Sequence, residues 1–188
     1  MTVRTGLQYI VDKIDTYIPS EASSFISDDE KQEILDRNKT RVYYNALTSE
    51  PTYVNNDYVY LYYRSSFDYL EQDTSGTAYF RMYNSGGTAI GTADYSADYA
   101  TGEFTFNSDT NNLPYYIDAY TYDLYAAMVE VWEVILANTS AMYDVQIEGR
   151  KYSRSQWFEH CNSMINLYKK KSLKFGNFQI PMYRGDFK

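Results

Sequence analysis

Hydrophobic positions in the last third of the chain recur at intervals of three and four residues. This spacing places side chains on one face of an α-helix. In the first such segment, residues 118–138, the apolar positions are Leu124, Ala127, Met128, Val131, Trp132 and Ile135. In the second, which follows residue 153, they are Trp157, Cys161, Met164, Ile165 and Tyr168. The pattern predicts two amphipathic helices that pack on each other and on further helices nearer the N-terminus.

The ends of the second helix carry their own signals. Ser153 and Gln156 have the spacing of a capping box, in which both side chains satisfy backbone N–H groups at the helix start. Lys169–Lys171 suit the negative end of the helix dipole. Between the two helices, residues 143–147 alternate as in a short strand, and Glu148-Gly149 predicts a turn.

Two shorter helices are expected near the N-terminus. The first has an apolar stripe that ends at Pro19, with Thr2 or Thr5 available as a cap. Its members are Leu7, Ile10, Val11, Ile14, Tyr17 and Ile18. The second begins with a capping box of Ser27 and Glu30 and runs to about Asn38, with Ile34 and Leu35 on its buried face. It is short, so we expect it to depend on a neighbouring element.

From Arg41 onward the period changes to two residues, which is the period of β-strands. Residues 58–63, 79–83 and 103–106 alternate in this way, and 115–117 give a last extended piece before the predicted long helix. Turn residues separate these segments: Pro51, Asn55-Asn56, Ser75-Gly76, Asn84–Gly87, Gly91 and Gly102. Short strands with such punctuation predict a small antiparallel sheet.

The order of these elements predicts an α+β fold: a small helical bundle core of about four helices, an inserted antiparallel β portion and an extended C-terminal tail. The expected divisions are N-terminal helices in 1–50, a Tyr-rich β portion in 51–117, C-terminal helices in 118–172 and the tail in 173–188. The tail is apolar but lacks helical spacing and contains Gly176, Pro181 and Gly185. Such a segment either folds back onto its own domain or binds a partner.

Composition narrows the classes of function. A net charge of −8 and a pI near 4.6 argue against a dedicated DNA or RNA binder, which needs cations for phosphate. The chain has 23 tyrosines in 188 residues. Tyrosine is enriched where proteins touch one another, and it also simply suits the exposed face of a sheet, so both interpretations stay open. We expect no targeting signal and no membrane span.

Catalytic and metal-binding motifs are not evident, and we expect no enzyme activity, cofactor or metal. His160 and Cys161 are adjacent, so on a helix they point about 100° apart and do not form a base and nucleophile pair. We predict that Cys161 is a small buried thiol. The acids Asp94, Asp98 and Asp109 lack EF-hand spacing and are expected to be solvated loop residues. A glycosidase carboxylate pair is not singled out by the sequence, and an aromatic β-layer leaves a carbohydrate-binding module as an alternative.

Several motifs resemble the head-to-tail connector adaptor proteins of tailed bacteriophages. They are Thr101–Phe106, Tyr116–Ala127, Trp132-Glu133, Tyr143–Val145 and Glu148–Gln156. The helix that begins at Ser27–Glu30 and ends in Leu35–Arg37 is similar to the second helix of that family. The resemblance covers most of the chain, whereas the Tyr-heavy strands and the tail match only loosely.

The resemblance implies a virion structural protein, assembled in the host cytoplasm and located in the neck between head and tail. It implies a ring, commonly of twelve copies, beneath the portal protein and above a downstream neck or tail protein. Genomic DNA would pass through the lumen without specific binding. The alternatives are a carbohydrate-binding or tail-associated β-module and another head-completion protein of the same stack.

Two sets of residues are predicted to make these contacts. The portal or tail would be bound by Phe175, Phe178, Ile180, Met182, Tyr183, Arg184 and Phe187. The interface between copies in the ring would use Tyr58, Tyr60, Tyr62, Tyr79 and Tyr83.

Overall fold

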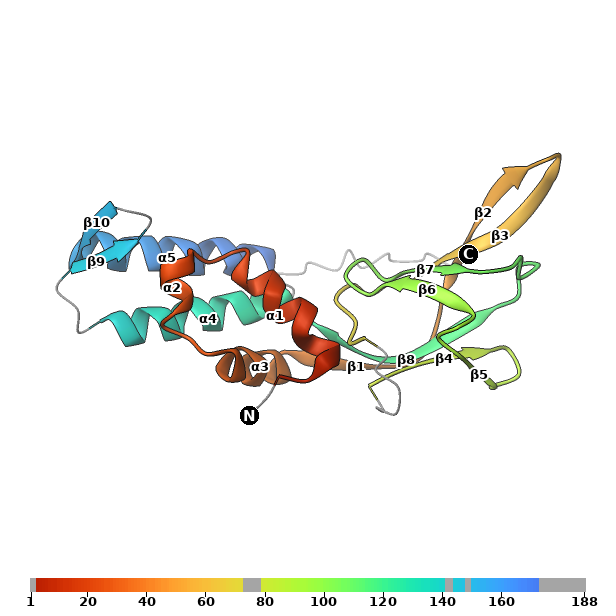
Figure 1. The fold of residues 1–188 in the computed structure, drawn as a ribbon, viewed down its shortest axis with the longest axis horizontal. Coiled ribbons are helices and arrows are strands. Elements are labelled where there is room, and N and C mark those ends of the chain that lie inside the picture. Colours follow the sequence, from red (N-terminus) through yellow and green to blue (C-terminus); the bar gives the residue numbers. More distant parts are fainter. Residues whose placement is uncertain (1–2, 73–78, 141–143, 148–149, 173–188) are drawn as a thin grey trace, which may run out of the picture.

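The protein consists of a helical lobe and a β-lobe that lie end to end along its long axis (Figure 1). The computed structural model describes residues 3–72, 79–140, 144–147 and 150–172. The helices are η1 (Thr5–Leu7), α1 (Gln8–Asp15), α2 (Ser20–Ser23), α3 (Asp28–Arg37), α4 (Leu124–Thr139) and α5 (Arg154–Lys171). The strands are β1 (Lys39–Ala46), β2 (Thr48–Val54), β3 (Asp57–Arg64), β4 (Phe80–Asn84), β5 (Ala89–Ile90), β6 (Tyr95–Asp98), β7 (Glu103–Phe106), β8 (Tyr115–Tyr122), β9 (Asp144–Ile147) and β10 (Arg150–Ser153).

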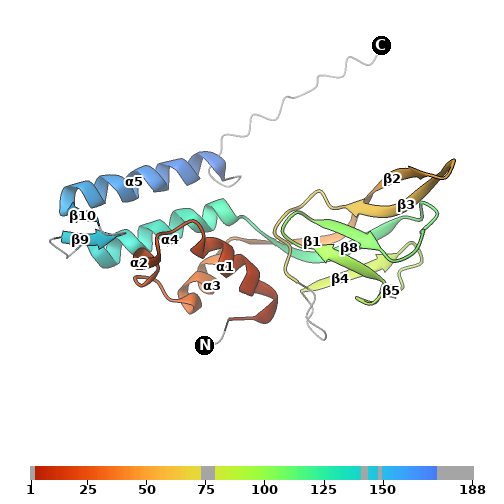
Figure 2. The same ribbon diagram turned by 45° about the horizontal axis from the view of Figure 1, so that its top comes forward.

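The helical lobe is built around α4. Trp132 lies fully buried near its middle and packs against Trp157 of α5, with ring centroids 6.3 Å apart. The N-terminal helices α1 and α3 contribute Ile10, Ile14 and Leu35 to the same core. The short hairpin of β9 and β10 lies at the far end of this lobe (Figure 2). Among the described residues, no helix is long and apolar enough to cross a membrane.

The β-lobe is a sandwich of two four-stranded antiparallel sheets. Sheet A has the strand order β1-β8-β4-β5, and sheet B has the order β2-β3-β7-β6. Their inner faces enclose a second hydrophobic core. Its buried members are Leu47, Tyr63, Leu70, Phe80, Met82, Tyr95, Phe104, Phe106, Tyr115, Ile117 and Ala119. This core is separate from that of the helices. The strands therefore form a sandwich with its own core, and they are not a small insertion into a helical bundle.

The predicted fold class is therefore wrong. A helical bundle core of about four helices with an inserted β portion is not present in the described residues; the helices are few and short, and about 32% of the chain is strand. α2 has only 4 residues and α1 has 8. Strands already begin at Lys39, and one of them replaces the first turn and a half of the long helix expected from residue 118.

The long helix begins later than predicted because residues 115–122 fit a two-residue period better than a helical one. Tyr115, Ile117 and Ala119 face the core of the sandwich, while the alternate side chains face outward. The helix begins only after Asp123, whose carboxylate accepts a hydrogen bond from the N–H of Ala126 at 2.9 Å. Asp123 is thus an N-cap, which the periodicity alone did not identify.

Local helix signals were more reliable. The capping boxes Ser27–Glu30 and Ser153–Gln156 are both confirmed, at the starts of α3 and α5. The strand predicted at 103–106 matches β7, and those at 58–63 and 79–83 overlap β3 and β4. Of the predicted caps of the first helix, Thr5 lies in η1 and Thr2 lies outside the described residues. The turn at 148–149 and the tail 173–188 also lie outside them.

One arginine ties the two lobes together. The guanidinium of Arg4 donates to Asp36 at the end of α3, with nitrogen–oxygen distances of 2.7 and 2.8 Å. It also donates to the carboxylate of Glu71, which is 2% exposed, at 3.1 Å. The hydroxyl of Tyr122, at the end of β8, donates to the same Glu71 carboxylate. The N–H of Glu71 donates to the carbonyl oxygen of Tyr120 on β8 at 2.9 Å, whereas Asp36 lies on α3 and the ring of Tyr122 belongs to the core of the helical lobe, so Arg4 bridges the junction.

Two further contacts hold the N-terminus in this position. The N–H of Gln72 donates to the carbonyl oxygen of Gly6 at 3.1 Å. A Cβ atom at Gly6 would lie 2.8 Å from the carbonyl oxygen of Gln72, so a side chain there would push η1 away from the segment that contains Gln72. The hydroxyl of Tyr9 donates to the carbonyl oxygen of Leu70 at 2.6 Å.

We expect Arg4→Met to destabilise the protein by roughly 3 kcal/mol, because it leaves the buried Glu71 carboxylate without its cation. The measurement is the free energy of unfolding in urea. The matched control is Lys39→Met, which removes a more exposed cation from Asp36 and should change stability by less than about 1 kcal/mol. Equal losses for the two variants would contradict the bridging role of Arg4.

Acid should weaken the junction. Burial alone would raise the pKa of Asp36, but hydrogen bonds from Arg4 and Lys39 outweigh it and hold that pKa below its ordinary value. The stabilising contribution is therefore complete above about pH 4, the unfolded Asp value, and is lost as the pH falls through the lower folded value. As the pH falls from about 5 to about 2, the free energy of unfolding of the Asp36→Asn variant should decrease less than that of wild type. Parallel stability curves would contradict this assignment.

Candidate functional site

Tyrosines are exposed on a hairpin that projects from the β-lobe. β2 and β3 pair from Thr48↔Arg64 to Val54↔Asp57, and their tip extends beyond the rest of the sandwich (Figures 1 and 2). Tyr53 and Tyr58 are cross-strand partners near the tip, and they are 60% and 59% exposed. Their ring centroids are 5.2 Å apart. The hairpin therefore presents a paired aromatic surface that the core of the sandwich does not use.

A second aromatic surface lies on sheet A, where β1 has a bulge. The register with β8 shifts between Val42 and Asn45, so that Tyr43 and Tyr44 together occupy the place of one residue. Tyr44 has a φ of 42°, a left-handed conformation that is unusual for a bulky residue. Its N–H donates to the Asp118 carboxylate at 2.6 Å, and its ring stacks on Tyr116 at 4.2 Å.

Cations accompany these aromatic side chains. The guanidinium of Arg41 lies 4.4 Å from the ring centroid of Tyr43 and 5.4 Å from that of Tyr120. The ammonium of Lys39 lies 5.3 Å from the same Tyr120 ring. Because Arg41 pairs with Tyr120 across the strands, these groups share the outer face of sheet A. We call this surface the basic tyrosine face: Lys39, Arg41, Tyr43, Tyr44, Arg81, Tyr83, Tyr116, Asp118 and Tyr120.

The predicted ring-interface tyrosines divide between the two sheets. Tyr58, Tyr60 and Tyr62 lie on β3 of sheet B, and Tyr79 and Tyr83 lie at and on β4 of sheet A. Tyr58 and Tyr62 are exposed, whereas the other three are partly buried. They therefore do not form one continuous site. The predicted portal-binding residues Phe175, Phe178, Ile180, Met182, Tyr183, Arg184 and Phe187 lie outside the described residues.

Sequence reasoning missed Tyr43, Tyr44 and Tyr53, three of the most exposed aromatic side chains. A signal for the first two was present, because two consecutive tyrosines in a strand normally point to opposite faces. Only a bulge brings both to one side, and a bulge depends on the partner strand. The segment around Tyr53 shows no alternation of apolar and polar residues, because β2 also contains Pro51 and polar residues.

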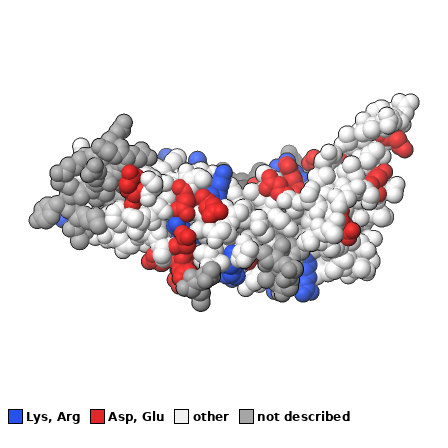
Figure 3. Space-filling model, in the orientation of Figure 1, with Lys and Arg blue, Asp and Glu red and all other residues white. Residues whose placement is uncertain are grey.

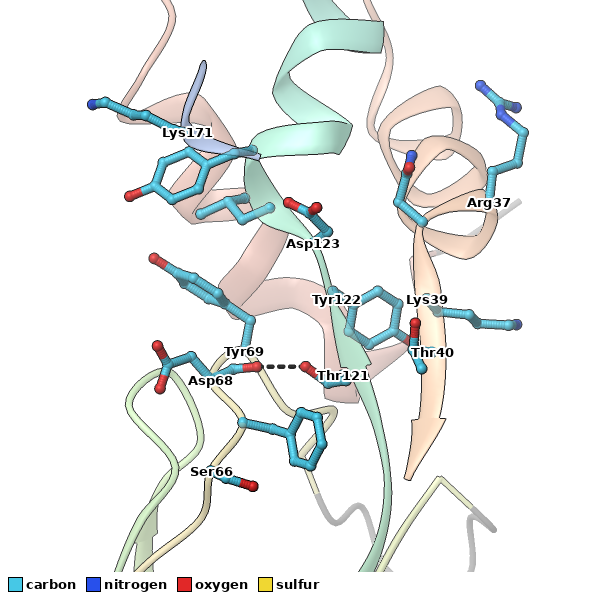
Figure 4. A pocket seen from close by; sticks show the side chains of 14 residues that line it. Arg37, Lys39, Thr40, Ser66, Asp68, Tyr69, Thr121, Tyr122, Asp123 and Lys171 are labelled. Atoms are coloured by element: carbon cyan, nitrogen blue, oxygen red, sulfur yellow. Dashed lines mark hydrogen bonds between the residues drawn. The ribbon is translucent and has the colours of Figure 1, made fainter. Parts of the chain in front are cut away.

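A cleft of about 650 Å³ opens at the junction of the lobes (Figure 4). It is bounded by the end of α3, the turn from β8 into α4, the end of α5 and residues 66–69. Its polar groups serve the fold: the hydroxyl of Thr121 donates to the carbonyl oxygen of Asp68 at 2.6 Å, and that of Ser172 donates to Asp123 at 2.9 Å. We therefore interpret the cleft as part of the joint between the lobes.

Cys161 and His160, the two residues considered for catalysis, lie in environments that do not suit it. Cys161 is a buried free thiol, as predicted, and burial raises its pKa to about 12. It is therefore protonated at neutral pH and a poor nucleophile. Burial lowers the pKa of His160, which lies among the rings of Trp132, Tyr152 and Trp157 at centroid distances of 5.5 to 6.3 Å. An imidazole in this position fills space in the helical lobe.

Backbone N–H groups occupy the carboxylates of two of the three acids considered for a metal site: Asp98, which ends β6, and Asp109. Asp98 accepts a hydrogen bond from the N–H of Ala100 at 3.0 Å. Asp109 accepts from the N–H groups of Tyr60 and Asn111, each at 3.0 Å, and these bonds lower its pKa. Asp94 lies in a turn closed by its own N–H to Gly91. Among the described residues, no group of three potential ligands is placed to hold a metal ion.

We expect the exposed hairpin tyrosines to contribute little to stability. Replacing Tyr53 and Tyr58 together by Thr removes one exposed aromatic pair and should lower the free energy of unfolding by about 1 kcal/mol or less. The control is Tyr63→Ala, which empties a buried site against Phe106 and Tyr115 and should cost roughly 4 kcal/mol. Both values come from urea unfolding. A loss for the double variant as large as that of the control would mean that these rings are structural.

Comparisons with known proteins assign no family to the chain. No family model matches it, and no curated protein sequence matches it either. The resemblance to the phage adaptor proteins therefore depends on the quoted sequence motifs alone.

Proposed function

We propose that this chain is a virion structural protein, a head-to-tail adaptor that forms a ring beneath the portal and links the capsid to the tail. The observation that carries the proposal is the set of exposed tyrosines on the β-lobe, at β1 and on the β2–β3 hairpin. Large aromatic side chains that the core does not use are typical of surfaces that bind another protein. The sequence motifs that resemble the adaptor family are the reason for proposing a ring in the neck of a phage and not another protein complex.

The scaffold suits such a role. The tyrosines lie on a sandwich that has its own hydrophobic core, and the helical lobe has a second core. Neither lobe therefore needs a partner protein in order to fold. Tyrosine has few rotatable bonds, so ordering it in an interface costs little entropy compared with longer side chains. Contact surfaces of this kind add binding energy without changing the fold.

The charge of the chain fits a conduit for DNA. A net charge of −8 on each copy, repeated around a ring, repels phosphate and disfavours adhesion of passing DNA. Lys169–Lys171 end α5, next to the tail that we propose binds the portal. Lys169 is paired with Glu133 at 3.5 Å and Lys171 lies over the rings of Tyr125 and Tyr168, and Lys170 is exposed, where it can meet an acidic surface.

A carbohydrate-binding module is the rival function. Such modules stack a sugar ring on the free face of an aromatic side chain. On the basic tyrosine face, Tyr44 and Tyr116 stack on each other, and Lys39 and Arg41 both lie against Tyr120. These contacts occupy ring faces that a sugar would need, so they favour the protein-binding function.

The proposal is tested by mixing the purified chain with portal-containing heads that lack neck proteins. We expect the full-length chain to cosediment with the heads and to appear by electron microscopy as a ring under the portal. A chain that ends at Ser172 should bind at least about tenfold more weakly, because it lacks the proposed portal-binding residues.

The control is a full-length chain with Phe158→Ser, which removes an exposed aromatic side chain from α5 of the helical lobe. It should bind the heads as wild type does. Equal binding of the truncated and full-length chains would reject the role of the tail. Binding to a glycan array without binding to heads would replace the adaptor with the carbohydrate-binding function.

A further inference from the structure

The two outer faces of the β-sandwich carry opposite charge. In Figure 3, Lys and Arg appear along the lower edge of the β-lobe, where sheet A lies, while Asp and Glu predominate over its upper part and on the hairpin. The basic tyrosine face has Lys39, Arg41 and Arg81 with Asp118 as its acid. Asp118 lies opposite Arg81 across the strands and also holds the bulge at Tyr44.

The outer face of sheet B is the acidic counterpart. Cross-strand pairing places Glu50 opposite Tyr62, and it aligns Arg64, Glu103 and Asp98 in one row on three adjacent strands. All five side chains are exposed. Arg64 is the cation in this group, and it lies 3.7 Å from Glu103. We call this set the acidic face.

We propose that the basic tyrosine face of one copy docks on the acidic face of the next copy, so that copies associate head to tail through their β-lobes. This assignment rests on the proposed function, since it names the surfaces by which the ring would close. Two different, complementary faces on opposite sides of one domain give heterologous contacts, which form rings or filaments and not closed dimers. The tyrosines of both faces supply contact area, and the opposite charges set the orientation.

The strained bulge supports this choice of surface. A regular strand would turn one of Tyr43 and Tyr44 toward the core, whereas the bulge keeps both outside, 64% and 49% exposed. The arrangement adds a second tyrosine to the face that also carries Arg41. A conformation of unfavourable φ that increases exposed aromatic area points to a contact made outside the chain.

Two charge-reversal variants test the pairing. Arg41→Glu with Arg81→Glu disables the basic tyrosine face, and Glu50→Lys with Glu103→Lys disables the acidic face. All four side chains are exposed, so both variants should fold. Each is examined by sedimentation velocity as the full chain, at about 0.05 M and about 0.5 M salt, since opposite charges attract less at high salt.

We expect wild type to associate as its concentration rises, at least about tenfold more strongly in low salt than in high salt. Each variant alone should remain monomeric. An equimolar mixture should associate again, because the intact basic face of one variant meets the intact acidic face of the other, and the two reversed faces are also opposite in charge. Combining all four substitutions in one chain should restore association.

The matched control is Lys13→Glu with Arg154→Glu, which changes net charge as much as the first variant but at exposed positions on α1 and α5. It should associate as wild type does. The inference is overturned if the mixture stays monomeric, if wild type does not associate at any concentration, or if either variant associates like wild type.

Two further outcomes distinguish this inference from nucleic-acid binding and from the adaptor function itself. If the basic tyrosine face binds a single-stranded oligonucleotide and the Arg41/Arg81 variant does not, the face serves nucleic acid and the docking of copies is rejected. If wild type binds portal-containing heads but both charge variants bind equally well, the adaptor function stands and the assigned faces are wrong. If wild type does not bind heads but the mixture of the two variants associates, the assigned faces stand and the adaptor function is rejected.

Discussion

The salt-bridged network around Arg4 is the constraint on which the shape of this protein depends. The two lobes have separate hydrophobic cores, and the chain passes between them where α3 leads into β1 and where β8 leads into α4. Such a narrow crossing would leave the lobes free to bend. Arg4 restrains such bending by joining Asp36 of α3 to Glu71, whose N–H is bonded to β8.

The fixed junction matters because the faces that we propose for contacts between copies are on the β-lobe, whereas Lys169–Lys171, which we propose to meet the portal, end α5 of the helical lobe. A ring requires each copy to meet its neighbour at a constant angle, and a small change of angle accumulates around the circle. Asp123 reinforces the same joint: it caps α4 and accepts the hydroxyl of Ser172, the last described residue. The end of α5 is thereby held beside the β8–α4 turn.

Local features of this fold could be predicted from the sequence, and features that depend on distant residues could not. The capping box of Ser27 and Glu30 was recognisable because its hydrogen bonds join residues three apart. The network of Arg4 with Glu71 and Tyr122 spans more than a hundred residues, and no periodicity reports it. The fold class was wrong for the same reason, because Tyr115–Tyr122 becomes a strand only when β1 and β4 pair with it.

The candidate surface illustrates the same limit. The abundance of tyrosine suggested contacts with other proteins, but the choice among tyrosines required the pairing of strands. Tyr58 and Tyr62, which were chosen from their alternation along the strand, are exposed, and their role in a ring interface stays a prediction. Tyr60, Tyr79 and Tyr83 were chosen on the same alternation, yet neighbouring elements cover part of each side chain. Alternation separates the two faces of a strand, and it does not say which face is covered.

Tyr44 shows most directly how the fold and the assembly are connected. Its φ of 42° costs about 1 to 2 kcal/mol relative to ordinary backbone conformations. The stack on Tyr116 and the hydrogen bond from its N–H to Asp118 return a similar amount, about 0.5 to 1.5 kcal/mol each. The isolated protein therefore gains little from the bulge. Its main effect is to place Tyr43 and Tyr44 together on the outer face beside Arg41, the face that we propose for contact with a neighbouring copy.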